Sequence, residues 1–143
     1  MPENGINTYN ENPLHAALKS YFASPGGEFE VPVDGYIADL VQDGVLVEIQ
    51  TANFGAMRRK LQSLLTKHPV RLIHPIAAEK WIVRLDMAGD QIGRRKSPKR
   101  GRWEMVFGEL VAFPQLMLDP NFTLGVVLIK EEEVRIVDGK RRR

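Results

Sequence analysis

The hydrophobic and polar residues in the first half of the chain follow two different periods. Over residues 13–22 the apolar residues are spaced by three or four, as in an amphipathic helix, and Pro13 suits its first turn. The period then becomes two in the runs EFEVPV, GYIADLVQ and VLVEIQT, which are separated by the hairpin turns Asp34-Gly35 and Asp43-Gly44. This pattern predicts a helix and a three-stranded antiparallel meander, with Pro32 placing the first strand at a sheet edge or at a bulge.

The second half of the chain adds a helix, further strands and a basic segment. Apolar residues at helical spacing predict an amphipathic helix over about 54–67 that faces the sheet and ends before Pro69. Two strands are expected next, VRLIHPI and EKWIVRLD, followed by a Gly-rich, basic loop over 88–102. A helix over about 103–111 and a final strand or strand pair in FTLGVVLIKEEEVRIV complete the chain. The expected order is αβββαββ, and then more.

Composition narrows the class of protein. A chain of 143 residues with 43% hydrophobic composition can bury a core, and we expect one domain over residues 13–138, between a disordered polar segment, 1–12, and a basic tail, 139–143. The absence of cysteine excludes disulfides and thiolate zinc sites, so the cytoplasm is the expected location. No run approaches the roughly 18 apolar residues of a membrane helix, and no phosphate-binding glycine loop or serine nucleophile motif is present.

Two acids interrupt the apolar runs of the predicted meander. If Asp43-Gly44 forms a two-residue turn, Asp39 lies directly opposite Glu48, with both side chains on one face of the sheet. The first hairpin in the same way places Glu30 opposite Asp39, so that one acidic row crosses three strands. Like charges at this spacing repel, and Mg²⁺ is often held by one or two carboxylates. A solvated acidic surface is the alternative, although the apolar neighbours of the two acids favour a metal site.

The order of elements and the placing of the acids resemble the PD-(D/E)XK nuclease superfamily. The shared features are a helix, a meander with an Asp on its second strand and Glu-x-Gln on its third, and a further helix and strand, over about residues 13–76. The segments VPVDGYIADLV, EIQTANF and RRKSPKRGR also resemble an uncharacterised family of prokaryotic proteins. The resemblance implies a restriction-endonuclease-like αβββαβ core, an α/β fold with a mixed sheet flanked by helices. It also implies hydrolysis of phosphodiester bonds, expected in DNA, with Mg²⁺ or Mn²⁺.

The resemblance also implies roles for single residues. Asp39 and Glu48 would hold the metal, the backbone carbonyl of Ile49 would add a ligand, and Glu30 would serve as an outer or second-metal acid. Gln50 stands where the superfamily has lysine, and an amide can orient water but carries no charge. That departure keeps a second hypothesis open, a catalytically inactive nuclease-fold module that binds nucleic acid or a partner protein.

Basic residues are the other candidates. Lys60 lies about a quarter turn from the apolar stripe of its helix, so it is either a solvated lysine or one that reaches the site and its nucleic acid. His15 is a packed or capping histidine or approaches the metal or phosphate. A cluster in the basic loop predicts phosphate contacts, with a solvated loop as the alternative; it comprises Arg94, Arg95, Lys96, Lys99, Arg100 and Arg102. The interspersed Ser, Pro and Gly are expected to keep this loop from packing. A homodimer is left open, since no feature identifies a dimer face.

Overall fold

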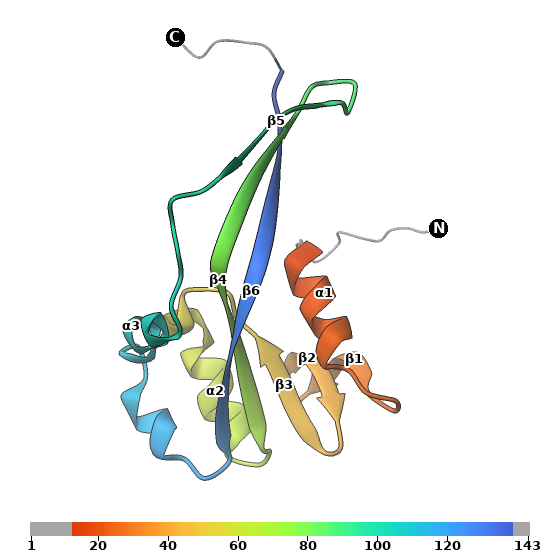
Figure 1. Ribbon diagram of the computed structural model, residues 1–143. Coiled ribbons are helices and arrows are strands. Elements are labelled where there is room, and N and C mark those ends of the chain that lie inside the picture. The colour runs from red at the N-terminus through yellow and green to blue at the C-terminus, as the bar shows by residue number, and fades with distance from the viewer. Residues whose placement is uncertain (1–12, 139–143) are drawn as a thin grey trace. The chain divides into compact units, whose positions relative to one another are not determined.

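The computed structural model describes residues 13–138, which form two compact units (Figure 1). Unit 1 comprises residues 13–74 and 106–126, and unit 2 comprises residues 75–105 and 127–138. The expectations for the N-terminal segment and for the basic tail lie outside the described residues. The expectation of one domain stays a prediction.

Unit 1 begins with the predicted helix and meander. They are α1 (Pro13–Phe22), β1 (Glu28–Val33), β2 (Tyr36–Gln42) and β3 (Val45–Ile49). Both Asp-Gly turns have two successive residues with positive φ, 48° and 84° in the first and 51° and 76° in the second. This backbone matches the twist of the flanking antiparallel strands. The two hairpins are therefore confirmed, and β1 lies at the edge of the sheet, as Pro32 predicted.

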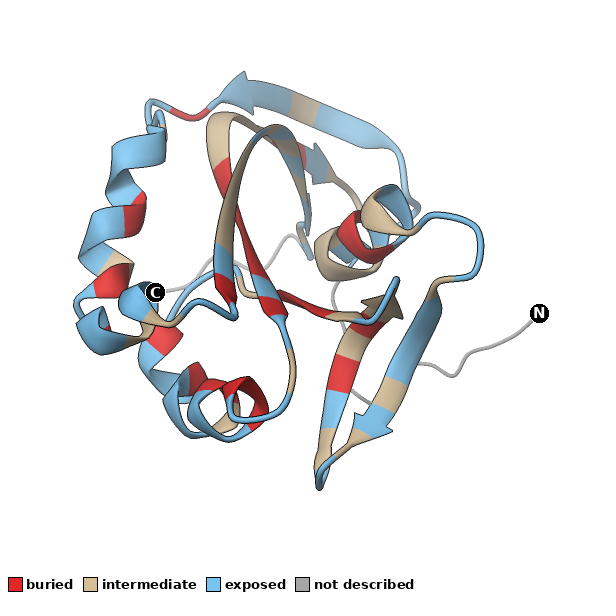
Figure 2. Ribbon diagram, turned by 90° about the horizontal axis from the view of Figure 1, so that it is seen from below, coloured by how far each residue is buried: buried red, intermediate tan, exposed pale blue. Residues whose placement is uncertain are grey.

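The second helix of unit 1 covers the sheet, as its apolar stripe predicted. Its first turn is a 3₁₀ helix, η2 (Phe54–Met57), and it continues as α2 (Arg58–Leu65). The buried residues of α2 lie on one face, and Figure 2 shows buried positions alternating with half-buried and exposed ones along the helices. The core cluster that they enter includes Phe54, Leu61, Leu64, Leu72 and Phe113, each at most 1% exposed.

The strand after α2 makes the sheet mixed. β4 (Val70–Leu85) starts in unit 1 and runs parallel to β3, whereas β1–β2 and β2–β3 are antiparallel. With helices packed on it, the sheet confirms the predicted α/β class with a mixed sheet flanked by helices.

The prediction of two strands between residues 70 and 86 was wrong, because β4 is continuous over 16 residues. Pro75 lies inside this strand, although proline cannot donate to a sheet ladder. The N–H that Pro75 lacks would fall at the end of the ladder between β3 and β4. There Gln50 N donates to Ile73 O at 3.0 Å, and in a parallel ladder the next hydrogen bond would run from the backbone N of residue 75 to Gln50 O. His74 Nδ1 donates to Gln50 O instead, at 2.8 Å, and the proline is tolerated.

Unit 1 is completed by α3 (Val106–Leu110), η4 (Pro114–Leu118) and the start of β6 (Phe122–Ile136). The expected helix near 103–111 is present as η3 (Trp103–Met105) followed by α3. β6 is one strand rather than a strand pair, and it pairs with β4. None of the helices within residues 13–138 is long and apolar enough to cross a membrane.

Unit 2 contains the later residues of β4 and β6 together with β5 (Gln91–Lys96). The prediction of a basic loop over 88–102 was wrong in its first part, because Arg94, Arg95 and Lys96 pair antiparallel with residues 81–83 of β4. This polar segment is held by a hydrogen-bonded ladder with β4, and Arg94 lies over the Trp81 ring at 4.0 Å from its centroid. Neither contact could be predicted from the composition of the segment.

Candidate functional site

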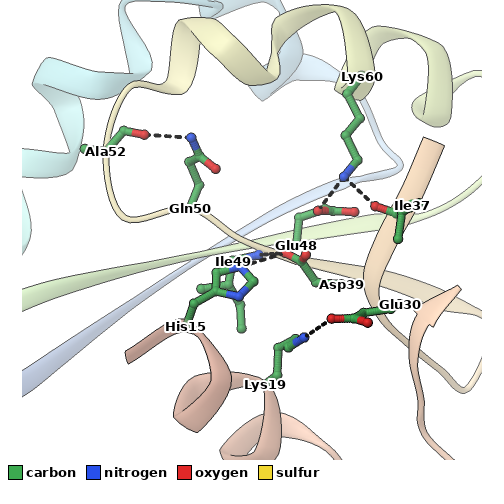
Figure 3. Close-up of polar contacts among 10 residues, drawn as sticks. All are labelled: His15, Lys19, Glu30, Ile37, Asp39, Glu48, Ile49, Gln50, Ala52 and Lys60. Atoms are coloured by element: carbon green, nitrogen blue, oxygen red, sulfur yellow. Dashed lines mark hydrogen bonds and ion pairs between the residues drawn. The ribbon is translucent and has the colours of Figure 1, made fainter. Parts of the chain in front are cut away.

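The predicted acid pair forms in unit 1. β2 and β3 pair as Leu40 with Val47, Val41 with Leu46 and Gln42 with Val45, the register that the Asp43-Gly44 turn predicted. This register brings Asp39 opposite Glu48, and Figure 3 shows the two carboxylates close together. The pair therefore needs only a short turn and a regular ladder to form.

Glu48 is buried with one oxygen left unpartnered. The side chain is 1% exposed, and its Oε2 lies 2.9 Å from Lys60 Nζ, which also donates to Ile37 O at 2.7 Å. Glu48 Oε1 has no hydrogen-bond partner while the acid is ionised, and no other buried side-chain oxygen or nitrogen within residues 13–138 shares that state. When Glu48 is protonated, its carboxyl group hydrogen-bonds to Asp39, which is one cause of its raised pKa. Leaving a buried charged acceptor unsatisfied costs several kcal/mol in general, so a site of this kind favours a ligand.

The two acids differ in their electrostatics. Burial, followed by repulsion from Asp39, raises the pKa of Glu48 to about 7, although Lys60 opposes the rise. Burial also acts to raise the pKa of Asp39, but the hydrogen bonds from His15 and from Ile49 N outweigh it and hold that pKa below its usual value. Near neutral pH the pair therefore carries an ionised Asp39 and a Glu48 that is partly protonated.

His15 reaches this site from α1. Its Nε2 lies 3.3 Å from Asp39 Oδ2, the atom to which Ile49 N donates at 2.9 Å (Figure 3). The sequence left a packed histidine and a site histidine open, because helical spacing alone does not say which strand residue a helix face meets. The structure places His15 at the acid pair.

Glu30 does not join the two acids as the predicted row required. The pairs Phe29 with Leu40 and Val31 with Ala38 hold it in the expected register opposite Asp39, but its φ is 54°. Its Oε1 lies 3.0 Å from Lys19 Nζ. The structure thus gives Glu30 a lysine partner, and the acidic row is reduced to two residues.

Gln50 and Lys60, the two other residues considered for the site, differ in their contacts. Gln50 Nε2 donates to Ala52 O at 2.7 Å and to Asn53 O at 3.3 Å, so the loop after β3 occupies its amide nitrogen (Figure 3). Lys60, which the sequence placed only on a helix flank, contacts Glu48 directly. The positive charge of the site therefore comes from α2 rather than from β3.

The donor set suits a hard divalent cation in part. Asp39 and Glu48 offer carboxylate oxygens, and Glu48 Oε1 is a buried acceptor without a partner. No group of three or more His, Cys, Asp or Glu suited to holding a metal occurs among the residues that the structure describes. Mg²⁺ often takes one or two carboxylates and completes its shell with water and substrate phosphate, so the pair fits that mode and not a closed protein cage.

The basic cluster lies in unit 2. Arg94, Arg95 and Lys96 belong to β5, and Lys99, Arg100 and Arg102 follow it. All of these residues are exposed. The prediction that the segment does not pack was wrong, because Ser97 is buried and its backbone N donates to Lys80 O at 2.8 Å.

The fold and the acid pair define an α/β protein with a buried carboxylate site next to a lysine. Residues 12–143 match a family described as a domain of unknown function, DUF8091, so the chain belongs to that family. An uncharacterised protein of Treponema pallidum (strain Nichols) is 36% identical over 138 residues, which are 96% of this chain and 55% of that protein. The chain thus spans about half the length of this relative. No solved structure matches the chain.

Proposed function

We propose that this protein is a metal-dependent nuclease that hydrolyses phosphodiester bonds in nucleic acid, with DNA as the expected substrate and Mg²⁺ or Mn²⁺ as cofactor. The observation that carries the proposal is the buried Glu48 Oε1, which has no partner when Glu48 is ionised, next to the ionised Asp39. A divalent cation would satisfy this oxygen and remove the repulsion that raises the pKa of Glu48.

The order of elements supports the same proposal. The succession α1, β1, β2, β3, α2, β4 is the αβββαβ order that the resemblance to the PD-(D/E)XK superfamily implies. Asp39 lies on the second strand and Glu48 on the third. The resemblance implies metal-binding acids on these two strands. A restriction-endonuclease-like core is accordingly part of the proposal.

The metal would be held by Asp39 and Glu48, with the backbone carbonyl of Ile49 as a further ligand. When bound, such an ion lowers the pKa of water and neutralises charge that develops on the phosphate. His15 and Ile49 N keep Asp39 ionised, ready to act as a ligand. Exclusion of water from Glu48 strengthens each of these charge interactions.

Lys60 supplies the positive charge that Gln50 lacks. Its Nζ, 2.9 Å from Glu48 Oε2, favours the ionised form of that acid. It would also supply a positive charge to a bound substrate phosphate. A lysine there stabilises negative charge as a point donor. Its contact with Ile37 O fixes the side chain before substrate arrives.

The second candidate function is a nuclease-fold module that binds nucleic acid or a partner protein without turnover. It is favoured by Gln50, whose amide nitrogen is bonded to Ala52 O and Asn53 O and carries no charge. In that case Asp39 and Glu48 would still bind the ion. Only the cleavage step would be missing.

A cleavage assay separates the two functions. Supercoiled, linear and branched DNA would be incubated with Mg²⁺ or Mn²⁺ and with wild type, Asp39→Ala or Lys60→Ala. The nuclease predicts nicking that both variants lose, whereas Lys67→Ala, an exposed lysine just beyond α2, retains it. Absence of cleavage by a wild type that binds the ion would favour the inactive module.

The proposed location is the cytoplasm, as the default for a chain whose composition does not indicate an oxidising compartment, and it stays a prediction.

A further inference from the structure

The cations of the basic cluster in unit 2 are not equivalent. Lys96 Nζ lies 2.9 Å from Glu79 Oε1, and Arg94 Nε lies 3.7 Å from Glu132 Oε1. Both cations also lie over the Trp81 ring, at 4.0 Å for Arg94 and 6.0 Å for Lys96. Hydrogen bonds from Lys96 and then from Trp81 hold the pKa of Glu79 below its usual value. The charges of Arg94 and Lys96 are thus offset within the protein.

The remaining cations of the cluster have no such partner. No carboxylate within residues 13–138 lies within ion-pair distance of them, and all are exposed; they are Arg95, Lys99, Arg100 and Arg102. Four like charges over eight residues repel one another in solution. A polyanion would relieve that repulsion.

Backbone contacts hold this segment against β4. Ser97 N donates to Lys80 O and Gly101 N donates to Ala77 O, both at 2.8 Å, and Ser97 Oγ accepts from Lys99 N at 3.3 Å. Gly101 approaches β4 so closely that a Cβ there would lie 2.6 Å from Ala77 O and would clash with Ile76 Cγ2. The segment is therefore fixed along the strand, and its cationic side chains are exposed to solvent.

We infer that Arg95, Lys99, Arg100 and Arg102 form a preset cationic strip that binds the phosphodiester backbone of a nucleic acid, and that Arg94 and Lys96 maintain the fold of unit 2 instead. The inference deepens the proposed function, since it rests on nucleic acid as the partner. Cations without internal partners release counterions from phosphate without first breaking an ion pair, so they supply the salt-dependent part of binding. A backbone that is already fixed lowers the ordering cost of association.

Two double variants that remove the same number of positive charges test whether the two groups of cations have different roles. Fluorescence anisotropy of a labelled duplex of about 20 base pairs would be followed against salt, in EDTA so that no cleavage occurs. Lys99→Gln/Arg100→Gln should lower the slope of log K against log salt by about 2 and weaken binding at least about tenfold near physiological salt. Arg94→Gln/Lys96→Gln should leave the slope unchanged and lower the melting temperature of the protein instead. Equal slopes in the two variants, or a wild type that does not bind, would overturn the inference.

A glycine pair tests the fixed backbone without changing charge. Gly101→Ala should weaken DNA binding because the added methyl group displaces the strip, whereas Gly93→Ala on β5 meets only Arg84 Cδ, at 3.9 Å, and should bind as wild type. Circular dichroism would verify that both variants fold. If Gly101→Ala is folded and binds DNA like wild type, the fixed strip is refuted.

Competitors identify the ligand chemistry. Unlabelled duplex DNA and duplex RNA should displace the probe, whereas poly-glutamate at equal charge concentration should compete far less well. Equal competition by poly-glutamate would contradict a phosphodiester site. The measurement does not involve Asp39 or Glu48, so it can succeed if the nuclease proposal fails, and the metal site can be verified if this strip fails.

Discussion

Removing the ionisable group at position 48 should abolish a loss of stability that the wild type suffers as the pH rises from about 4.5 to about 7. The pKa of Glu48 is raised from 4.5 to about 7 in the folded protein, so between these values the folded state binds more protons than the unfolded state. The resulting stabilisation is fully present below pH 4.5 and is lost as the pH rises through about 7. Glu48→Gln cannot ionise and avoids that loss.

The expected magnitude follows from the two pKa values. The interval between 4.5 and about 7 corresponds to about 3 kcal/mol in the free energy of unfolding. Urea unfolding followed by far-ultraviolet circular dichroism, without divalent ions, would compare Glu48→Gln with wild type at pH 4.5 and pH 8. Between pH 4.5 and pH 8, the free energy of unfolding of Glu48→Gln relative to that of wild type should rise by about 3 kcal/mol.

An exposed acid gives the matched control. Glu28→Gln, at the start of the edge strand β1, should show no such change between the two pH values. Surface substitutions usually change the free energy of unfolding by no more than about 0.5 kcal/mol. If the difference in unfolding free energy between Glu48→Gln and wild type changes by no more than this between the two pH values, the raised pKa of Glu48 is refuted.

Three further predictions concern the acid pair and the helix α2 that lies over it. Divalent-ion affinity should fall as the pH drops below 7, because a proton on Glu48 competes with the metal and is released when the metal binds. Calorimetry in buffers of different ionisation enthalpy would detect the released proton, and an affinity independent of pH would contradict the prediction. Lys60→Ala should destabilise the protein by about 3 kcal/mol at pH 8 and by less at pH 5, measured by urea unfolding against Lys67→Ala, since Glu48 loses its partner. Leu61→Ala, fully buried on α2, should cost about 2–5 kcal/mol, and a cost below 1 kcal/mol would show that α2 does not pack as described.

The meander and its acid pair could be predicted because both depend on short-range chemistry. Two Asp-Gly turns fix the length of each hairpin loop, and the loop length fixes which residues face one another. Asp39 and Glu48 were therefore located from the residues between them. The amphipathic stripe of η2 and α2 was equally local, since Phe54, Leu61 and Leu64 all enter the core.

Features that depend on contacts between residues far apart in the sequence could not be predicted. The continuity of β4 depends on where β3 stops and on His74 replacing the missing donor at Pro75. The pairing of Glu30 with Lys19 depends on how α1 lies against β1. The need for glycine at position 101 arises only when its segment lies on Ala77. None of these contacts leaves a period or a motif in the sequence.

The proposed nuclease site depends on Asp39 and Glu48 binding one divalent ion. This binding can be measured by titration of Mn²⁺ followed by electron paramagnetic resonance, because the free ion gives a signal that diminishes on binding. Wild type and Glu28→Gln should bind one ion that Mg²⁺ displaces, and Asp39→Asn and Glu48→Gln should bind none at the same concentrations. An unchanged free-ion signal with wild type, or equal binding by Glu48→Gln, would contradict it.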